Sequence, residues 1–244
     1  MNTTASKPPV PWLMLFSRIA LFAGIQAIFA LAFYLTGSAS AWETSANWWP
    51  FVVIITNLVC MFLLVRIFRA EGNRYFDIFR IDRSHIKGDL LALLGITIIT
   101  APVSLLPNTL LGGWLFGDPN ATLNLFVRPL PIWAVYVLII IFPVTNGLVE
   151  LATYFGYIMP RLESQGLRPC LAVTLPALML GLQHITMPLL FDIRFILWRG
   201  LMYIPFAFLT GIVIHWRPRM LPYLAIVHVL MNLSFATMFL NAAY

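Results

Sequence analysis

Long apolar blocks, separated by short polar stretches, run through almost the whole chain. A helix that spans a bilayer needs about 20 consecutive, mainly apolar residues. Seven segments meet this requirement, and they cover residues 12–36, 48–69, 88–115, 131–160, 169–190, 195–216 and 219–241. The pattern therefore predicts an all-α fold, a polytopic transmembrane helical bundle with about seven spanning helices. We expect residues 1–244 to form a single integral membrane domain.

Prolines interrupt two of the predicted helices. Pro102 and Pro107 lie in the segment 88–115, and Pro143 lies in the segment 131–160. A proline frees a backbone carbonyl, which in a bilayer must find a partner on neighbouring helices or in water. We therefore expect both helices to pack inside the bundle.

The composition agrees with a membrane protein. Hydrophobic residues make up 61% of the chain, charged residues only 10%, and the mean hydropathy is +0.88. A soluble domain needs about a quarter of its residues charged. The net charge of +6 comes mostly from arginines in short loops between apolar blocks. Such a distribution indicates a lipid bilayer as the partner and no nucleic acid.

The basic residues also predict an orientation. Lys7 and the loops around residues 66–87, 161–168 and 217–219 hold eleven Lys and Arg residues, whereas the opposite loops hold only three, which are Arg128, Arg194 and Arg199. Cytoplasmic loops carry an excess of Lys and Arg. We expect a multi-pass protein of the cell membrane with its N-terminus in the cytoplasm and its C-terminus outside.

Most polar residues within or next to the predicted spans have a structural interpretation. We expect Arg18 and Arg199 to extend their charged ends to the membrane interfaces. Polar side chains can also join helices by hydrogen bonds, and this interpretation covers Asn57, Asn108, Asn146 and Gln183. The others are expected to be small buried residues (Cys60 and Cys170) or surface and interfacial residues (His85 and His215).

Four further polar residues fall in the middle third of the membrane: Glu150, His184, His228 and Asn232. At a rise of ~1.5 Å per residue, they lie roughly 14–22 Å from the cytoplasmic face. Ionisable groups at this depth cost several kcal/mol and are functional candidates by default. His228 and Asn232 are four residues apart and therefore share one helix face.

These residue types suit the hydrolysis of an amide bond. A carboxylate can remove a proton from water, and a histidine can orient it or share the proton. A second histidine and an amide can donate hydrogen bonds to an oxyanion. Three alternatives remain open: a zinc ion held by Glu150, His184 and His228, structural bonds between helices, and a transporter with Glu150 as a proton relay.

At these residues the chain resembles the CPBP family of CAAX proteases and bacteriocin-processing enzymes. These intramembrane proteases have three motifs on separate helices, E-E-x-x-x-R, F-x-x-x-H and H-x-x-x-N. Glu150, followed by Gly156-Tyr157 and then Pro160-Arg161-Leu162, is similar to the first motif. His184 aligns with the histidine of the second, and His228-Val-Leu-Met-Asn232 matches the third. The resemblance covers about residues 130–240.

The resemblance implies an activity and also shows departures. Glu150 and His184 would activate water, His228 and Asn232 would hold the oxyanion, and the substrate would be a prenylated peptide tail or another membrane-associated peptide. Leu151 replaces the second glutamate, Phe155 the arginine, and Leu180 the phenylalanine. Loss of both members of a charge pair leaves neither charge buried alone. These departures favour an alternative, a non-catalytic bacteriocin-immunity or scaffold protein of the same fold.

Overall fold

A computed structural model describes residues 10–118 and 121–244, so Lys7 lies outside the described residues. The described chain is helical throughout, apart from turns and one isolated bridge between Thr186 and Leu189. The predicted all-α fold is therefore confirmed, and the apolar helices support a multi-pass membrane protein.

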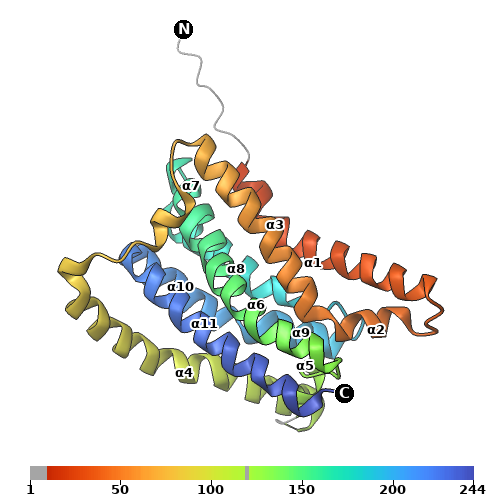
Figure 1. Ribbon diagram of the computed structural model, residues 1–244. Helices are drawn as coiled ribbons and strands as arrows, with labels where there is room; N and C mark the ends of the chain where they lie inside the picture. The colour runs from red at the N-terminus through yellow and green to blue at the C-terminus, as the bar shows by residue number, and fades with distance from the viewer. Residues whose placement is uncertain (1–9, 119–120) are drawn as a thin grey trace.

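The helices follow one another in the order shown in Figure 1. In chain order they are α1 (Val10–Leu35), α2 (Ala41–Asn47), α3 (Trp49–Ala70), η1 (Tyr75–Phe79), η2 (Arg83–His85), α4 (Ile86–Phe116), α5 (Ala121–Phe126), α6 (Ile132–Leu151), η3 (Ala152–Ile158), α7 (Met159–Ser164), α8 (Pro169–Leu182), η4 (Gln183–Ile185), α9 (Ile193–Met202), α10 (Ile204–Trp216), η5 (Pro218–Met220), α11 (Leu221–Thr237) and η6 (Met238–Ala242).

Among the described residues, six continuous helical segments are long and apolar enough to cross a membrane. The expected seventh spanning helix, residues 169–190, is shorter than predicted, because α8 and η4 end at Ile185. The chain nevertheless continues in the same direction. The Trp12 indole donates to the Gln165 side chain before α8, and Gln26 bonds to Leu189 after it. Trp12 and Gln26 are ~21 Å apart along α1 at 1.5 Å per residue. The helix α8, η4 and the irregular segment after them together therefore cross most of the membrane alongside α1.

The irregular segment is stabilised by polar side chains of neighbouring helices. Gln26 donates to the Leu189 carbonyl (2.9 Å) and accepts from the Leu189 amide (2.7 Å). The Trp42 indole donates to the same carbonyl, and Arg199 donates to the carbonyl of Met187. Non-helical backbone at membrane depth is tolerated only where protein or water satisfies it. Arg199 therefore lies inside the bundle, and the expectation that it extends to an interface was wrong.

The helix α4 lies along one edge of the bundle (Figure 1). Almost none of its residues is buried by the rest of the protein. It stays helical through Pro102 and Pro107, so the expectation that these prolines mark an interior helix was wrong. The same expectation is correct for Pro143, which is buried on α6.

Polar contacts near both ends attach α4 to the bundle. At its start, Asp89 is fully buried and forms ion pairs of 2.8 Å with Arg217 and Arg219. Near its other end, the Trp198 indole donates to the Asn108 side chain (2.9 Å). The contact confirms that Asn108 joins two helices, as the sequence indicated. The exposed apolar side chains of α4 suit contact with lipid.

The two cysteines and two outer histidines have different surroundings. Cys60 is buried as expected, but Cys170 is exposed at the start of α8, so its predicted burial was wrong. His85 is exposed and pairs with Asp82. His215 is partly exposed and pairs with Glu163 at the end of α10.

Candidate active site

One cavity brings the four predicted residues together. Glu150 comes from α6, His184 from η4, and His228 and Asn232 from α11. All four line the same cavity, whose volume is about 170 Å³. Glu150 is 2% exposed and His184 8%. The rest of the wall is mainly apolar, so the site combines apolar walls with a few convergent polar groups.

A close approach of α6 and α11 places Glu150 beside His228. Gly147 makes this approach possible, because a Cβ there would lie 2.3 Å from a Val229 methyl group and 3.0 Å from the Ala225 carbonyl oxygen. One turn later, His228 Nε2 lies 2.9 Å from Glu150 Oε2. A carboxylate only accepts hydrogen bonds, so Nε2 carries the hydrogen in this contact. The α-helix then widens into the π-helix η3 directly after Leu151.

His184 faces the other oxygen of Glu150. Its Nδ1 donates to the carbonyl oxygen of Leu180 at 2.8 Å. This bond fixes the orientation of the ring and leaves Nε2 as the hydrogen-bond acceptor. This Nε2 lies 3.7 Å from Glu150 Oε1. Two acceptors at that distance cannot bond directly, but one water molecule can donate to both of them.

Two amide side chains that the sequence analysis assigned to helix contacts also belong to the site. Gln183 donates to Glu150 Oε1 at 2.5 Å, and Asn146 donates to Oε2 at 2.8 Å. An ionised carboxylate offers about four lone pairs. Gln183, Asn146 and His228 use three of them, and the fourth belongs to Oε1, the oxygen beside His184. This free position is where a water could be deprotonated.

Arg18 sets the direction of these amide hydrogen bonds. It is fully buried on α1, so the expectation that it extends to the interface was wrong. Its Nε donates to Gln183 Oε1 (2.7 Å) and its Nη1 to Asn57 Oδ1 (2.8 Å). Asn57 in turn donates to the oxygen of Asn146 (3.2 Å). Because arginine only donates, each amide must present its NH₂ group on the side that leads to Glu150.

The sequence contained partial signals for these missed residues. Asn146 is four residues before Glu150 and shares its helix face, and Gln183 directly precedes His184. Arg18 is eight residues inside α1, or ~12 Å from its first residue. This depth is too great for its side chain to reach the interface easily. Asn57 carried no such signal, because it adjoins no other candidate in the sequence.

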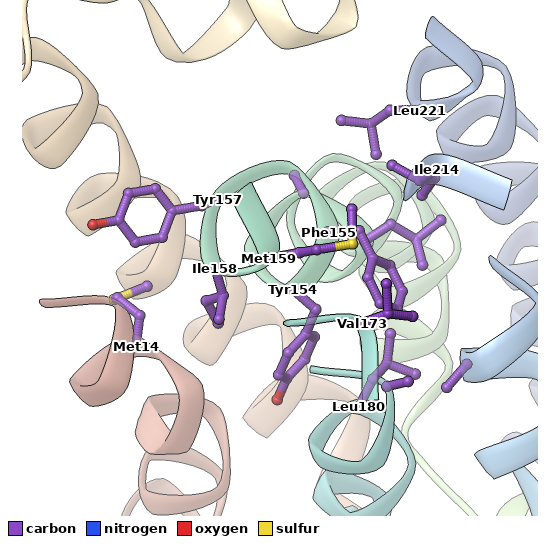
Figure 2. Packing of buried hydrophobic residues seen from close by; sticks show 14 of the residues in the cluster. Met14, Tyr154, Phe155, Tyr157, Ile158, Met159, Val173, Leu180, Ile214 and Leu221 are labelled. Carbon is purple, nitrogen blue, oxygen red and sulfur yellow. The ribbon is translucent and has the colours of Figure 1, made fainter. Parts of the chain in front are cut away.

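The positions that depart from the family motifs are filled by apolar packing. Leu151, Phe155 and Leu180 are all 2% exposed or less. Phe155 lies in the apolar cluster of Figure 2, near Val173 and Ile214. Its ring fills the space that Gly211 leaves open, since a Cβ at Gly211 would lie 2.7 Å from the ring. A guanidinium at this position would therefore be surrounded by apolar side chains.

Asn232 and His228 lie next to each other, and most of their hydrogen-bond donors are already in use. Asn232 donates to the His228 carbonyl at 2.7 Å, which leaves one amide hydrogen free. His228 donates from Nε2 to Glu150, and its Nδ1 is buried without a partner in the described chain. An oxyanion beside them would therefore meet one free donor first.

The donors do not fit the zinc alternative. Within residues 10–118 and 121–244, no group of three or more His, Cys, Asp or Glu side chains is arranged to hold a metal ion. Both oxygens of Glu150 already accept amide hydrogen bonds, and the two histidines approach different oxygens. A zinc ion would have to displace these amide donors before the three side chains could bind it together.

In comparisons with known proteins, no family model, no curated protein and no solved structure matches the chain.

Proposed function

We propose that this protein is an intramembrane peptidase of the CPBP type that hydrolyses a peptide bond with a water activated by Glu150 and His184. One observation carries the proposal. Among the contacts of the described residues, the one lone pair that Glu150 has left is on the oxygen that lies 3.7 Å from His184 Nε2. A water held there has two acceptors, and both groups line a cavity of about 170 Å³ in which a peptide bond could be placed.

The proposed reaction follows from the hydrogen bonds of the site. The water gives a proton to Glu150, and its oxygen attacks the carbonyl carbon of the peptide. Asn232 donates its free amide hydrogen to the resulting oxyanion. Once Glu150 is protonated, His228 no longer donates to a charged carboxylate, and its Nε2 hydrogen turns to the oxyanion as well. Glu150 then passes its proton to the leaving amine as the C–N bond breaks.

The chemistry of the site suggests the setting of the substrate. The cavity lies among apolar helices, and its walls are largely apolar. This surrounding favours a membrane-associated peptide, either prenylated or with an apolar sequence. The excess of basic residues in one set of loops supports an N-terminus in the cytoplasm and a C-terminus outside, in a cell membrane.

A panel of fluorogenic peptides, incubated with the purified protein in lipid vesicles, tests the proposal. Glu150→Gln keeps the shape of the side chain but removes the base, so it should reduce kcat by at least 100-fold, the lower end of what a general base contributes. Glu163→Gln is the matched control, since Glu163 lies outside the cavity and pairs with His215. Substantial activity in Glu150→Gln would contradict the mechanism.

A scaffold or bacteriocin-immunity protein is the second candidate. It is favoured by Leu151 and Phe155, which leave the first motif without its second carboxylate and its guanidinium. It is also favoured by Asn232, which donates to its own helix. If a cellular phenotype of the protein persisted after replacement of Glu150, His184, His228 and Asn232 together, with unchanged expression, the scaffold function would be correct.

A further inference from the structure

We propose that Arg199 is a carboxylate-binding residue of the cavity and receives an anionic group of the bound peptide, foremost its C-terminal carboxylate. This proposal rests on the proposed function for its ligand class, a peptide. It adds a specificity-determining residue that none of the family motifs contains.

The first observation is that Arg199 is a buried cation without an anion. The residue is 1% exposed. Among the described residues, no carboxylate forms an ion pair with it. The faces of Phe126 and Trp198 lie 4.2 Å and 5.7 Å from its guanidinium carbon. Aromatic faces attract a cation, but they do not replace the hydrogen bonds that it loses on burial.

The second observation is that the hydrogen bonds of Arg199 go only to uncharged groups. A guanidinium has five N–H groups. One Nη2 hydrogen is donated to the Met187 carbonyl, one Nη1 hydrogen points to the Met202 sulfur at 3.8 Å, and the Tyr203 side chain is a further partner. The Nε hydrogen has no partner in the described chain. The Met187 contact explains why an arginine stabilises this backbone segment, but none of these partners supplies a carboxylate.

The third observation is the position of Arg199. It lines the same cavity as Glu150, His184 and Asn232, so a peptide bound for hydrolysis would enter the field of this charge. The planar guanidinium matches a carboxylate with two parallel hydrogen bonds. The contrast with Arg18 is informative, because Arg18 is also buried but its donors lead through amides to Glu150. The partners of Arg199 are uncharged and do not lead to a carboxylate by hydrogen bonds, and an anionic ligand would supply one.

The cavity also limits what this ligand can be. Its volume of about 170 Å³ is below the ~300–1,000 Å³ of pockets for drug-sized molecules. It therefore accepts the end of a chain or a few side chains, not a folded segment. Most of the other lining residues are apolar, so the preferred end of the peptide is apolar apart from its carboxylate.

Direct binding tests the proposal without requiring cleavage. The probe is the dipeptide acetyl-Leu-Phe, prepared as the free acid and as the C-terminal amide, and its Kd for the full-length protein in vesicles is measured. The acid should bind about 10–100-fold more tightly than the amide, as expected for a hydrogen-bonded charge pair. A third probe, acetyl-Leu-Asp amide, carries the carboxylate on a side chain. Tight binding of this probe would assign the subsite to an acidic side chain, and weak binding to the chain end.

Two variants identify the residue responsible. Arg199→Met should remove the preference for the acid and leave the Kd of the amide nearly unchanged. Arg199→Lys keeps the charge without the planar group and should retain a smaller preference. Arg194→Met is the control, because Arg194 is exposed and pairs with Asp192. If Arg199→Met does not fold, Arg199→Lys decides, because an undiminished preference for the acid in that variant would overturn the proposal.

The outcomes are distinct. Equal binding of acid and amide to the unaltered protein would overturn the proposal, and so would an acid preference that survives in Arg199→Met. An acid preference that depends on Arg199, in a protein that cleaves no peptide of the panel, would support the carboxylate subsite and contradict the peptidase. The failure of one proposal is therefore distinguishable from the failure of the other.

Discussion

The buried charge of Arg18 can be tested by its energetic coupling to Glu150. The change Arg18→Met removes a guanidinium from the centre of the bundle and replaces it with an apolar side chain of similar length. Arg18 does not touch Glu150, but Gln183 and Asn146 connect the two through hydrogen bonds. If the amides are oriented for the carboxylate, the effect of removing Arg18 must depend on whether Glu150 is charged.

The magnitude follows from the contacts of Arg18. Its bonds of 2.7 Å to Gln183 and 2.8 Å to Asn57 are charge-assisted, and such bonds contribute about 1.5–3 kcal/mol each. Its guanidinium also lies 5.1 Å from the centre of the Phe22 ring. We expect Arg18→Met alone to lower the free energy of unfolding by about 3–5 kcal/mol, the usual cost of leaving one buried charge without its partner. In the Glu150→Gln background the cost should fall by about 1–2 kcal/mol, because no anion remains to be compensated.

The assay is reversible denaturation of four proteins in a mild non-ionic detergent: the unaltered protein, both single variants and the double variant. Arg66→Met controls for the loss of a basic residue, since Arg66 is exposed on α3 near Phe62. Effects of Arg18→Met and Glu150→Gln that add within about 0.5 kcal/mol would refute the reasoning, because independent sites add to that accuracy. The network would then be a set of unrelated helix contacts.

Three further predictions address other parts of the site and fold. Gly147→Ala should separate α6 from α11 and reduce kcat by at least 10-fold, because the new methyl group meets Val229 and the Ala225 carbonyl. The control Gly24→Ala, at a glycine with open space around it, should leave kcat unchanged. Full activity in Gly147→Ala would contradict the role of this contact. Asp89→Asn should loosen α4 and lower the free energy of unfolding by about 1–3 kcal/mol, between the values for exposed and buried ion pairs, since Asp89 is buried but both arginines are about one-third exposed. Limited proteolysis between α3 and α4 measures the loosening, and an unchanged cleavage rate would show that these ion pairs do not hold α4. Incubation with a chelator should leave peptidase activity unchanged within twofold, because the amides of Gln183 and Asn146 that bond to Glu150 are not metal ligands. Activity that is lost on chelation and restored by zinc would show that the site rearranges to bind metal.

The sequence predicted the apolar helices well because lipid imposes a simple rule on length and composition. The segment 48–69, for example, is found as Trp49–Ala70. The rule fails for residues 169–190, where the helix ends at Ile185, directly after His184, and an irregular segment follows. The partners that stabilise this segment, Gln26 and Trp42, are more than 140 residues away in the sequence. No local pattern could have revealed them.

The candidate site was predicted in part for a similar reason. Glu150 and His228 could be found because each is costly at its depth. Asn146 and Gln183 could not be separated from ordinary helix contacts, since an amide buried between helices looks the same in the sequence whichever partner it has. The burial of Arg18 depends on neutral partners, Gln183 and Asn57. Because neither partner is an acidic residue, the sequence showed no pair of opposite charges that would have indicated it.

The charges inside the bundle bear on the departures from the motif that the first region resembles. Leu151 and Phe155 stand where the resemblance would place a carboxylate and a guanidinium, and α1 supplies the guanidinium of Arg18 from another direction. Among the described residues in and around the cavity, Glu150 carries one negative charge, whereas Arg18 and Arg199 carry two positive charges. A peptide that brings its own carboxylate restores neutrality. This relation makes a joint prediction: Glu150→Gln removes the negative charge and should strengthen the preference for acetyl-Leu-Phe acid over its amide, whereas Glu163→Gln should leave that preference unchanged.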